Sequence, residues 1–247
     1  MTYTKYDASG NDFVIFHTDI EKDYSKEAIK LCSKEYFDTD GLIVIVPHET
    51  LDFKWLFYNN DGSIASMCGN GTRAVAHYAK DNNLVGDSCT FLTGAGEISC
   101  EINDNIVQTQ MTKPISIKKE FIEDHLRCCI IDTGVPHLVI SVNTLDLFDL
   151  KIAAKFRKKY NANVNYFTVK NDILYVRTFE RGVEGETKAC GTGMVACFIK
   201  ALNMNLISSN VTVYPSSMEK INIKKENQIL YFSGAVKKIS SKDLKNI

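Results

Sequence analysis

A Cys-Gly-x-Gly turn occurs twice in this chain, and the duplication constrains the fold more than any other feature. The first copy contains Cys68 and the second contains Cys190, 122 positions later in a chain of 247 residues. Each copy follows a polar, glycine-containing run and precedes a helix-favouring run, at residues 74–79 and 195–202. The first N–H groups of a helix lack intrahelical partners and lie at the positive end of the helix dipole. Each turn therefore predicts a thiol placed where a thiolate or another anion is stabilised.

The rest of the chain repeats with nearly the same offset. A strand–turn–strand pattern around Gly10 returns around Gly134, and the helical composition of residues 25–37 returns at 150–160. The apolar strand predicted near residues 40–46 returns at 163–169. The offset stays between 121 and 124 through five predicted elements, which indicates an internal duplication.

The repeat predicts an α+β fold of two pseudo-symmetric domains, each a mostly antiparallel or mixed β-sheet curled around a central helix. We expect the first domain to cover residues 1–114 together with the C-terminal tail, about 237–247, and the second to cover 115–236. The second central helix is apolar nearly all round except at Lys200, which favours a helix enclosed by its own sheet. The charged segments 118–120 and 237–238 are interpreted as solvated surface or linker.

Composition excludes several classes of protein. Apolar residues make up 45% and charged residues 24% of the chain, as in ordinary globular proteins, and the formal charge of −1 gives no support for binding nucleic acid or a membrane surface. The sequence contains no apolar run of about 18 residues, and its N-terminus lacks the apolar core of a signal peptide. We therefore expect a cytoplasmic protein in a reducing setting, with no membrane partner.

Eight cysteines need an explanation in such a setting. Neither Cys-x-x-Cys nor His-Glu-x-x-His occurs, so we expect no metal site. Most of the cysteines stand in apolar or alternating runs and are interpreted as small buried hydrophobic residues: Cys32, Cys89, Cys100, Cys128, Cys129 and Cys197. Cys68 and Cys190 differ, because flanking glycines give them no packed side-chain neighbours in sequence.

Two thiols on opposite sides of one carbon atom can invert a stereocentre. One removes the α-proton as general base, and the other returns a proton to the opposite face as general acid. The backbone N–H groups of Gly69, Asn70, Gly191 and Thr192 would stabilise the carboxylate of the carbanionic transition state. We expect no cofactor, since no signal for a Schiff-base lysine or a phosphate-binding cup is found.

Six motifs, in order across almost the whole chain, resemble those of the diaminopimelate epimerase family. They are Ser9-Gly10-Asn11-Asp12-Phe13, Asn59-Asn60-Asp61-Gly62-Ser63, Met67-Cys68-Gly69-Asn70-Gly71-Thr72-Arg73, Pro136-His137, Glu180-Arg181-Gly182 and Gly185-Glu186-Thr187-Lys188-Ala189-Cys190-Gly191-Thr192-Gly193. The resemblance implies a cofactor-independent isomerase that interconverts LL- and meso-diaminopimelate for lysine and cell-wall precursors. A small amino-acid substrate is then the expected partner, with a homodimer as the assembly to be tested.

The resemblance also implies roles for individual residues. Cys68 and Cys190 match the two catalytic positions, and His137 and Glu180 match positions that adjust the thiol pKa values. Substrate-contacting positions are matched by Asn11, Asn59, Asn163, Glu180 and Arg181, with Gly69, Asn70, Gly191 and Thr192 at the reacting carboxylate. Arg181 could hold the distal carboxylate of the substrate bidentately.

Bland interpretations compete with some of these roles. Asn11 could cap a turn, His137 could be a core histidine, and Glu180 with Arg181 could form a solvated surface pair. For Arg73 we favour a structural role. Val135 stands where many family members have asparagine, and Gly41 where some have glutamine.

Three other functions remain open from the residues alone. They are a racemase for another amino acid such as histidine or proline, a thiol redox protein in which the two cysteines form a disulfide, and an amino-acid-binding module.

Overall fold

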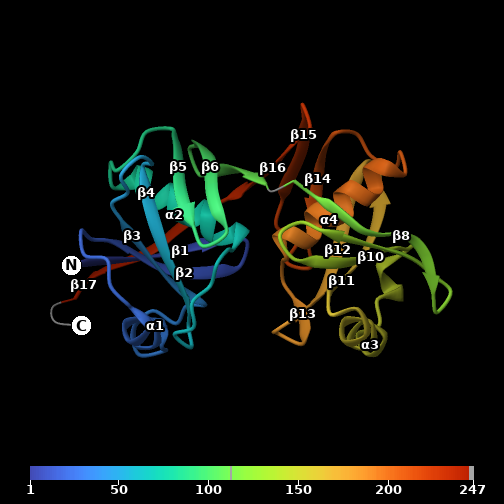
Figure 1. Cartoon of the computed structure of the whole chain (residues 1–247), viewed down its shortest axis with the longest axis horizontal. Helices are drawn as coiled ribbons and strands as arrows, with labels where there is room; N and C mark the ends of the chain where they lie inside the picture. Colours follow the sequence, from blue (N-terminus) through green and yellow to red (C-terminus); the bar gives the residue numbers. More distant parts are fainter. Residues whose placement is uncertain (112, 245–247) are drawn as a thin grey trace. The chain divides into compact units, whose positions relative to one another are not determined.

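The computed structural model describes residues 1–111 and 113–244 and shows two compact units (Figure 1). One unit comprises Met1–Gln110 and the C-terminal segment from Gly234, and the other comprises Met111–Ser233. Residues 245–247 of the expected tail lie outside the described residues. Within the described part each unit combines a mixed sheet with two α-helices, which confirms the predicted α+β class.

The first unit is built from a mixed sheet and two helices. Its elements are β1 (Thr2–Ala8), β2 (Asn11–His17), α1 (Ser25–Cys32), β3 (Gly41–Val46), β4 (Phe53–Asn59), α2 (Gly69–Asp81), β5 (Ser88–Thr93), β6 (Gly96–Asn103), β7 (Ile106–Met111, which ends at the boundary) and β17 (Lys237–Asp243). Strand β17 pairs antiparallel with β1.

The second unit uses the same plan. Its elements are β8 (Ile115–Glu123), β9 (Leu126–Asp132), β10 (Pro136–Ser141), a 3₁₀ turn η1 (Leu145–Leu147), α3 (Leu150–Tyr160), β11 (Asn163–Lys170), β12 (Ile173–Glu180), β13 (Gly185–Thr187), α4 (Gly191–Asn203), β14 (Asn210–Tyr214), β15 (Ile221–Glu226) and β16 (Ile229–Ala235). Helix α3 is capped at its start by Asp149, whose carboxylate accepts from two backbone N–H groups, and at its end by Asn161, which has the left-handed conformation.

Strand pairing follows the internal repeat. In the first unit β2 runs parallel to β3, β3 antiparallel to β4, and β4 parallel to β5. In the second unit β10 runs parallel to β11, β11 antiparallel to β12, and β12 parallel to β14. Each unit therefore forms its sheet from equivalent strands in the same relative directions.

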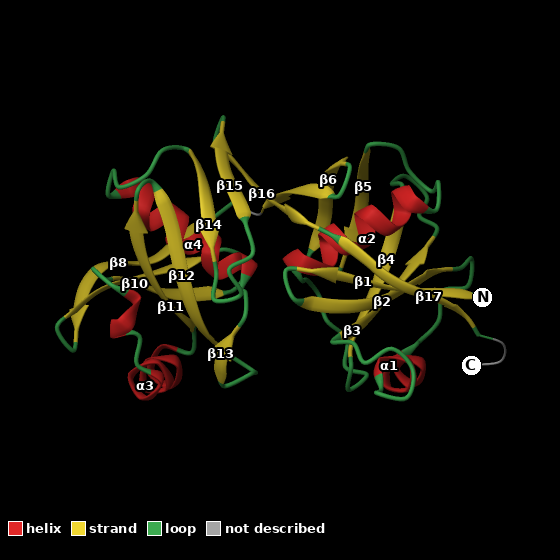
Figure 2. Ribbon diagram, turned by 180° about the vertical axis from the view of Figure 1, so that it is seen from behind, coloured by secondary structure: helices red, strands yellow, loops and turns green. Residues whose placement is uncertain are grey.

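Strand β3 shows why each unit needs two helices. All six of its residues are buried, because alternate side chains enter two different cores. Ile43 and Ile45 pack with α2, whereas Leu42, Val44 and Val46 pack with α1. Figure 2 shows α1 and α2 as separate helices with strands of the sheet between them.

The central helix α4 is apolar enough to be enclosed. The residues of α4 from Gly193 to Phe198 are buried, as are Lys200 and Ala201. The Nζ atom of Lys200 is satisfied by an ion pair with Glu120 on β8. This contact lets the one basic residue of an otherwise apolar helix lie under the sheet.

One sequence expectation needs correction, and two charged segments that were expected at the surface prove to be strands. Helix α1 ends at Cys32 rather than Phe37, because Ser33 takes an extended conformation and its Oγ donates to the carbonyl of Lys30. Lys118, Lys119 and Glu120 are exposed, which agrees with the solvated-surface interpretation, and they belong to β8, a largely exposed strand paired antiparallel with β9 through an irregular register. Lys237 and Lys238 are exposed, as expected, but lie within β17.

Candidate active site

Both cysteines of the duplicated turn are the N-cap residues of the central helices. Cys68 precedes α2 and Cys190 precedes α4, and both have extended backbone angles. The first intrahelical bonds run to their carbonyls, from Thr72 N to Cys68 O and from Met194 N to Cys190 O, each at 2.9 Å. The backbone N–H groups that follow each cysteine therefore belong to the first helical turn, which has no intrahelical acceptor for them. The residues concerned are Gly69, Asn70, Gly191 and Thr192.

A glycine two residues into each helix allows close packing beneath the cysteine. A Cβ atom on Gly193 would lie 2.2 Å from Oδ1 of Asn165 on β11. The equivalent Gly71 would place a Cβ 3.3 Å from Cδ1 of Ile43 on β3. In both units the first turn of the central helix thus rests on the same position of the second parallel strand.

Arg73 anchors the first turn of α2 from inside the first unit. Its side chain is fully buried. Nη2 donates to Oγ of Ser9 at 2.6 Å and to Oδ1 of Asn70 at 3.0 Å, and Nη1 donates to the carbonyl of Gly69 at 3.2 Å. The structural role expected for Arg73 is therefore a specific one, because its guanidinium fixes the two residues that follow Cys68.

The amide orientations at this site follow from the guanidinium. An arginine only donates, so Oδ1 of Asn70 faces Arg73 and its Nδ2 faces outward. That Nδ2 donates to Oδ1 of Asn11 at 2.5 Å, and Nδ2 of Asn11 donates to Oδ2 of Asp40 at 3.1 Å. The result is a chain of hydrogen bonds with one direction, from the cation of Arg73 to the carboxylate of Asp40.

Asn59 lies at the end of β4, opposite Gly41 on β3. Its Nδ2 donates to Oγ of Ser63 at 2.9 Å, and the neighbouring Asn60 N–H donates to the carbonyl of Asp40. The side chain is half-buried. The first unit thus brings Asn59, Asn11 and Asn70 to the strand ends next to the mouth of α2.

In the second unit His137 contacts the first turn of α4. Its Nε2 lies 3.0 Å from Oγ1 of Thr192, and this oxygen lies 3.7 Å from Sγ of Cys190. Nδ1 of His137 lies 3.0 Å from Nδ2 of Asn165. Burial lowers the pKa of His137 to about 3, so the imidazole is neutral at physiological pH.

Asn163, Glu180 and Arg181 lie where β11 begins and β12 ends. Oδ1 of Asn163 accepts the backbone N–H of Arg181 at 2.8 Å, and Nη1 of Arg181 donates to the carbonyl of Asn161 at 3.1 Å. Burial raises the pKa of the Glu180 carboxyl. A carboxyl whose charged form is disfavoured can exchange a proton nearer neutral pH, as expected of a group at a reaction site.

Sequence reasoning missed four residues that support this site: Ser9, Asp40, Asn165 and Thr178. Asn165 carried a signal in the sequence, since it is an asparagine among the apolar residues of a predicted buried strand. The structure shows that its side chain is fully buried. Ser9 has a positive φ of 57°. The glycine at position 10 indicates a turn in this region, but it does not identify Ser9 as a residue with positive φ.

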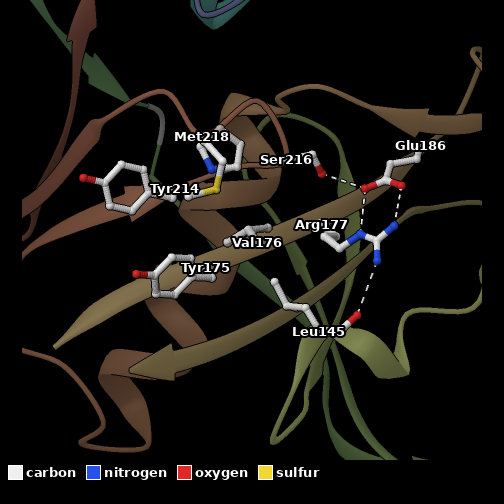
Figure 3. A pocket seen from close by; sticks show the side chains of 9 residues that line it. Leu145, Tyr175, Val176, Arg177, Glu186, Tyr214, Ser216 and Met218 are labelled. Carbon is white, nitrogen blue, oxygen red and sulfur yellow. Dashed lines mark hydrogen bonds and ion pairs between the residues drawn. The ribbon is translucent and has the colours of Figure 1, made fainter. Parts of the chain in front are cut away.

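A separate hollow of about 350 Å³ lies on the second unit (Figure 3). One wall is an ion pair in which Nε and Nη2 of Arg177 donate to the two carboxylate oxygens of Glu186, at 2.8 and 2.6 Å. The opposite wall includes the stacked rings of Tyr175 and Tyr214. None of the predicted site residues lines this hollow.

The described residues contain no group of three or more His, Cys, Asp or Glu side chains arranged to hold a metal ion. Among residues 1–111 and 113–244, every helix is too short or too polar to span a membrane.

Known proteins place the chain in a family. The diaminopimelate epimerase family profile matches residues 3–117 and 129–239. A diaminopimelate epimerase of Nitratiruptor is 48% identical over 97% of this chain and 96% of its own length, and one of Campylobacter jejuni subsp. doylei is 47% identical over 96% of each. The crystal structure of a Bacillus anthracis phenazine biosynthesis protein of the PhzF family has the same fold, with a TM-score of 0.76, 15% identity, and coverage of 100% of this chain and 99% of that one. The chain belongs to the diaminopimelate epimerase family.

Proposed function

We propose that this protein is an isomerase that interconverts LL-2,6-diaminopimelate and meso-2,6-diaminopimelate without a cofactor. The observation that carries the proposal is the pair of N-cap cysteines, Cys68 on α2 and Cys190 on α4, in a chain of this family. The reaction serves the supply of lysine and of peptidoglycan precursors.

The chemistry assigned to the two cysteines is a two-base proton transfer. One sulfur, as thiolate, removes the α-hydrogen of the substrate, and the other, as thiol, delivers a proton to the opposite face of the same carbon. The charge that develops on the α-carboxylate is stabilised by the first-turn N–H groups of the central helices, which are fixed dipoles and need no reorganisation. The donors proposed are those of Gly69, Asn70, Gly191 and Thr192.

We assign substrate recognition to polar side chains near the helix mouths. Asn11, Asn59, Asn163, Glu180 and Arg181 are proposed to contact the diaminopimelate. Arg181 suits the distal carboxylate, since a guanidinium binds a carboxylate bidentately. A substrate that lacks the distal amino-acid end would leave these groups unpaired and would be rejected.

The test is deuterium exchange in heavy water with LL-diaminopimelate and no added cofactor. In a two-base mechanism the proton donated to the product comes from solvent, so meso product carries deuterium at the inverted carbon before the remaining substrate does. We expect Cys68→Ser and Cys190→Ser each to lower kcat by about 10²–10⁴-fold, the usual contribution of an acid or base. Cys89→Ala, in the core of the first unit, is the matched control and should retain kcat.

Other outcomes would favour the competing functions. Turnover of histidine or proline but not of diaminopimelate would identify a racemase for another amino acid. A thiol-dependent redox activity that persists without any α-hydrogen exchange would identify a redox protein.

We also propose a cytoplasmic location and a homodimer. A reducing compartment keeps catalytic thiols available for proton transfer. Strand β8 exposes Ile115, Ile117 and Ile122, an apolar surface that a second copy of the chain could cover. Sedimentation velocity of the purified protein tests the assembly.

A further inference from the structure

The second unit contains a line of hydrogen bonds that ends at Cys190. Thr178 Oγ1 lies 2.9 Å from Oδ1 of Asn165, and Nδ2 of Asn165 lies 3.0 Å from Nδ1 of His137. From His137 the line continues to Thr192 and then to Sγ of Cys190. The donor of each hydrogen bond determines the donor of the next one. The orientation of one end therefore determines which atom donates in every bond of the line.

The fixed end is the amide of Asn165. Its Nδ2 lies 3.2 Å from the carbonyl oxygen of Leu138 and 3.4 Å from that of Asn163. Carbonyl oxygens only accept, so the atom that faces them is the NH₂ group. Oδ1 then accepts from the hydroxyl of Thr178, and the amide cannot be rotated by 180° without losing these bonds.

The orientation of Asn165 selects the histidine tautomer. Because Nδ2 of Asn165 is a donor, Nδ1 of His137 must be the acceptor. The ring is fully buried, and burial keeps it neutral with a pKa of about 3, so its single proton is on Nε2. Nε2–H therefore donates to Oγ1 of Thr192.

Because Oγ1 of Thr192 accepts from His137, its own hydroxyl proton points away from the imidazole. Sγ of Cys190 lies within sulfur hydrogen-bond range of that oxygen. The backbone of Thr192 is held in place as well, since Oγ1 of Thr133 donates to its carbonyl at 2.9 Å. A hydroxyl held in this way stabilises a thiolate more than a thiol.

We propose that Asn165 is a positioning residue for catalysis, which acts through His137 to aim the hydroxyl of Thr192 at Sγ of Cys190 and so favours the thiolate there. The catalytic meaning of this arrangement rests on the proposed function, in which Cys190 is one of the two acid–base groups. His137 acts as a neutral hydrogen-bond donor in this arrangement and carries no proton to the substrate.

The second unit has space for the side chain of Asn165 beneath the first turn of α4. Position 165 corresponds to Ile43 of the first unit, and both lie under the first turn of the central helix. Only a glycine at 193 leaves room for Oδ1 of Asn165. The polar line is therefore particular to the second unit, whereas the first unit has a hydrocarbon at the same place.

Other ionisable groups on the elements around α4 do not take the place of the hydrogen bond from Thr192 to Cys190. Burial raises the pKa of Cys197 well above its ordinary value and that of Cys129 to about 11, so both remain neutral. Lys200 is paired with Glu120. At the end of β12 stand Glu180, whose pKa is raised by burial, and Arg181, whose charge helps to keep His137 neutral.

The first test is the tautomer of His137, read from long-range ¹H–¹⁵N spectra of the full-length protein without substrate. We expect the neutral Nε2–H form from about pH 5 to pH 9. In Asn165→Asp a carboxylate replaces the donor, and the ring should turn to the Nδ1–H form. An Nδ1–H or doubly protonated ring in the unsubstituted protein at pH 7 would overturn the proposal.

The second test is the pH dependence of alkylation of Cys190 by iodoacetamide, followed on its own peptide by mass spectrometry. Thr192→Val should move the midpoint up by about one pH unit, since it removes a donor to the thiolate, whereas Thr192→Ser should leave the midpoint within a few tenths of a unit. Asn165→Asp should shift it in the same direction as Thr192→Val. The matched control is Thr168→Val on β11, which loses a buried hydroxyl bond to the carbonyl of Asn143 and should leave the midpoint unchanged.

An unchanged midpoint in Thr192→Val would overturn the proposal. If Asn165→Asp fails to fold, the Thr192 pair and the tautomer of the unsubstituted protein still decide the matter. Neither test uses diaminopimelate, so a failure of the proposed function and a failure of this inference give different results.

Discussion

At the scale of single residues, the polar side chains beside Cys68 and Cys190 are oriented by groups that can only donate or only accept hydrogen bonds. A guanidinium can only donate, so Arg73 fixes the amide of Asn70 and, through it, that of Asn11. Carbonyl oxygens can only accept, so those of Leu138 and Asn163 fix the amide of Asn165. Pre-set amide directions reduce the ordering that the substrate must impose when it binds.

Arg73→Met tests the first of these anchors. The substitution leaves the buried acceptors of Ser9, Asn70 and Gly69 without this donor, so we expect the free energy of unfolding of the first unit to fall by roughly 3 kcal/mol. Arg73→Lys should recover only part of the loss, because an ammonium cannot reproduce the planar geometry. Urea titration followed by the fluorescence of Trp55, the single tryptophan, measures the change.

The control for Arg73 is Lys34→Met, which removes an exposed cation from the same unit and should change the stability by less than about 0.5 kcal/mol. Equal stability of Arg73→Met and Lys34→Met would contradict the anchoring role.

Residue roles of this kind were only partly predictable from the sequence. The cysteine turns are local patterns, and their place at the helix N-caps is confirmed. The contacts of Asn165 were not predictable, because its partner His137 becomes a neighbour only through the parallel register that sets His137 opposite Asn163. Such a register depends on pairing between segments far apart in sequence, which leaves no local signal.

At the scale of elements, β13 is the short strand that leads into Cys190, and an ion pair ties it to β12. Arg177 holds both carboxylate oxygens of Glu186, and its Nη1 donates to the carbonyl of Leu145 (Figure 3). The guanidinium of Arg177 also lies over the ring of Phe148. The ion pair holds the pKa of Glu186 below its usual range. A strand of three residues gains much of its order from such side-chain contacts.

Arg177→Met should therefore loosen the segment from Gly185 to Cys190. Both partners are partly exposed, so we expect a loss of only about 1 kcal/mol in unfolding free energy. Local opening should be affected more: amide hydrogen exchange over 185–190 should accelerate by roughly tenfold. Lys188→Met, which removes an exposed cation from the same segment, is the control and should leave exchange unchanged. If both variants exchange alike, the ion pair does not order β13.

Strand β8 shows where element prediction failed. Its residues are mostly exposed, and its register with β9 shifts twice, so neither face carries the alternation by which a half-buried strand is recognised. Helix α3 was predicted with its observed bounds from its helical composition. In the structure Asp149 caps its start, and Asn161, in the left-handed conformation, caps its end.

At the scale of the whole molecule, the chain has two compact units, each with two hydrophobic clusters of its own, one around the central helix and one around the outer helix. Trp55 belongs to the central cluster of the first unit. Its fluorescence therefore reports the unfolding of that unit, even in a protein whose second unit has been altered by substitution.

Buried thiols give the molecule a defined sensitivity to alkaline pH. Burial raises the pKa of Cys32 to about 11, while an unfolded cysteine has a pKa of about 8.5. Between these values the unfolded chain has released a proton that the folded chain retains. The stabilisation by the neutral thiol is fully present below about pH 8.5 and is lost as the pH rises towards 11, by about 1.4 kcal/mol for each pH unit.

Cys32→Ala isolates this contribution in the first unit. We expect the variant to lose about 1 kcal/mol at pH 7.5, where a small cavity is the only cost. Its unfolding free energy should then fall less steeply than that of the unsubstituted protein between pH 9 and pH 10.5, by about 1.4 kcal/mol per pH unit, because all other titrating groups are shared. Urea titrations at a series of pH values, followed by Trp55 fluorescence, give both slopes.

Cys129→Ala alters a thiol of the second unit, whose pKa burial also raises to about 11, and should leave the Trp55 slope unchanged. Parallel slopes for Cys32→Ala and the unsubstituted protein would show that the Cys32 thiol ionises in the folded state as readily as in the unfolded one.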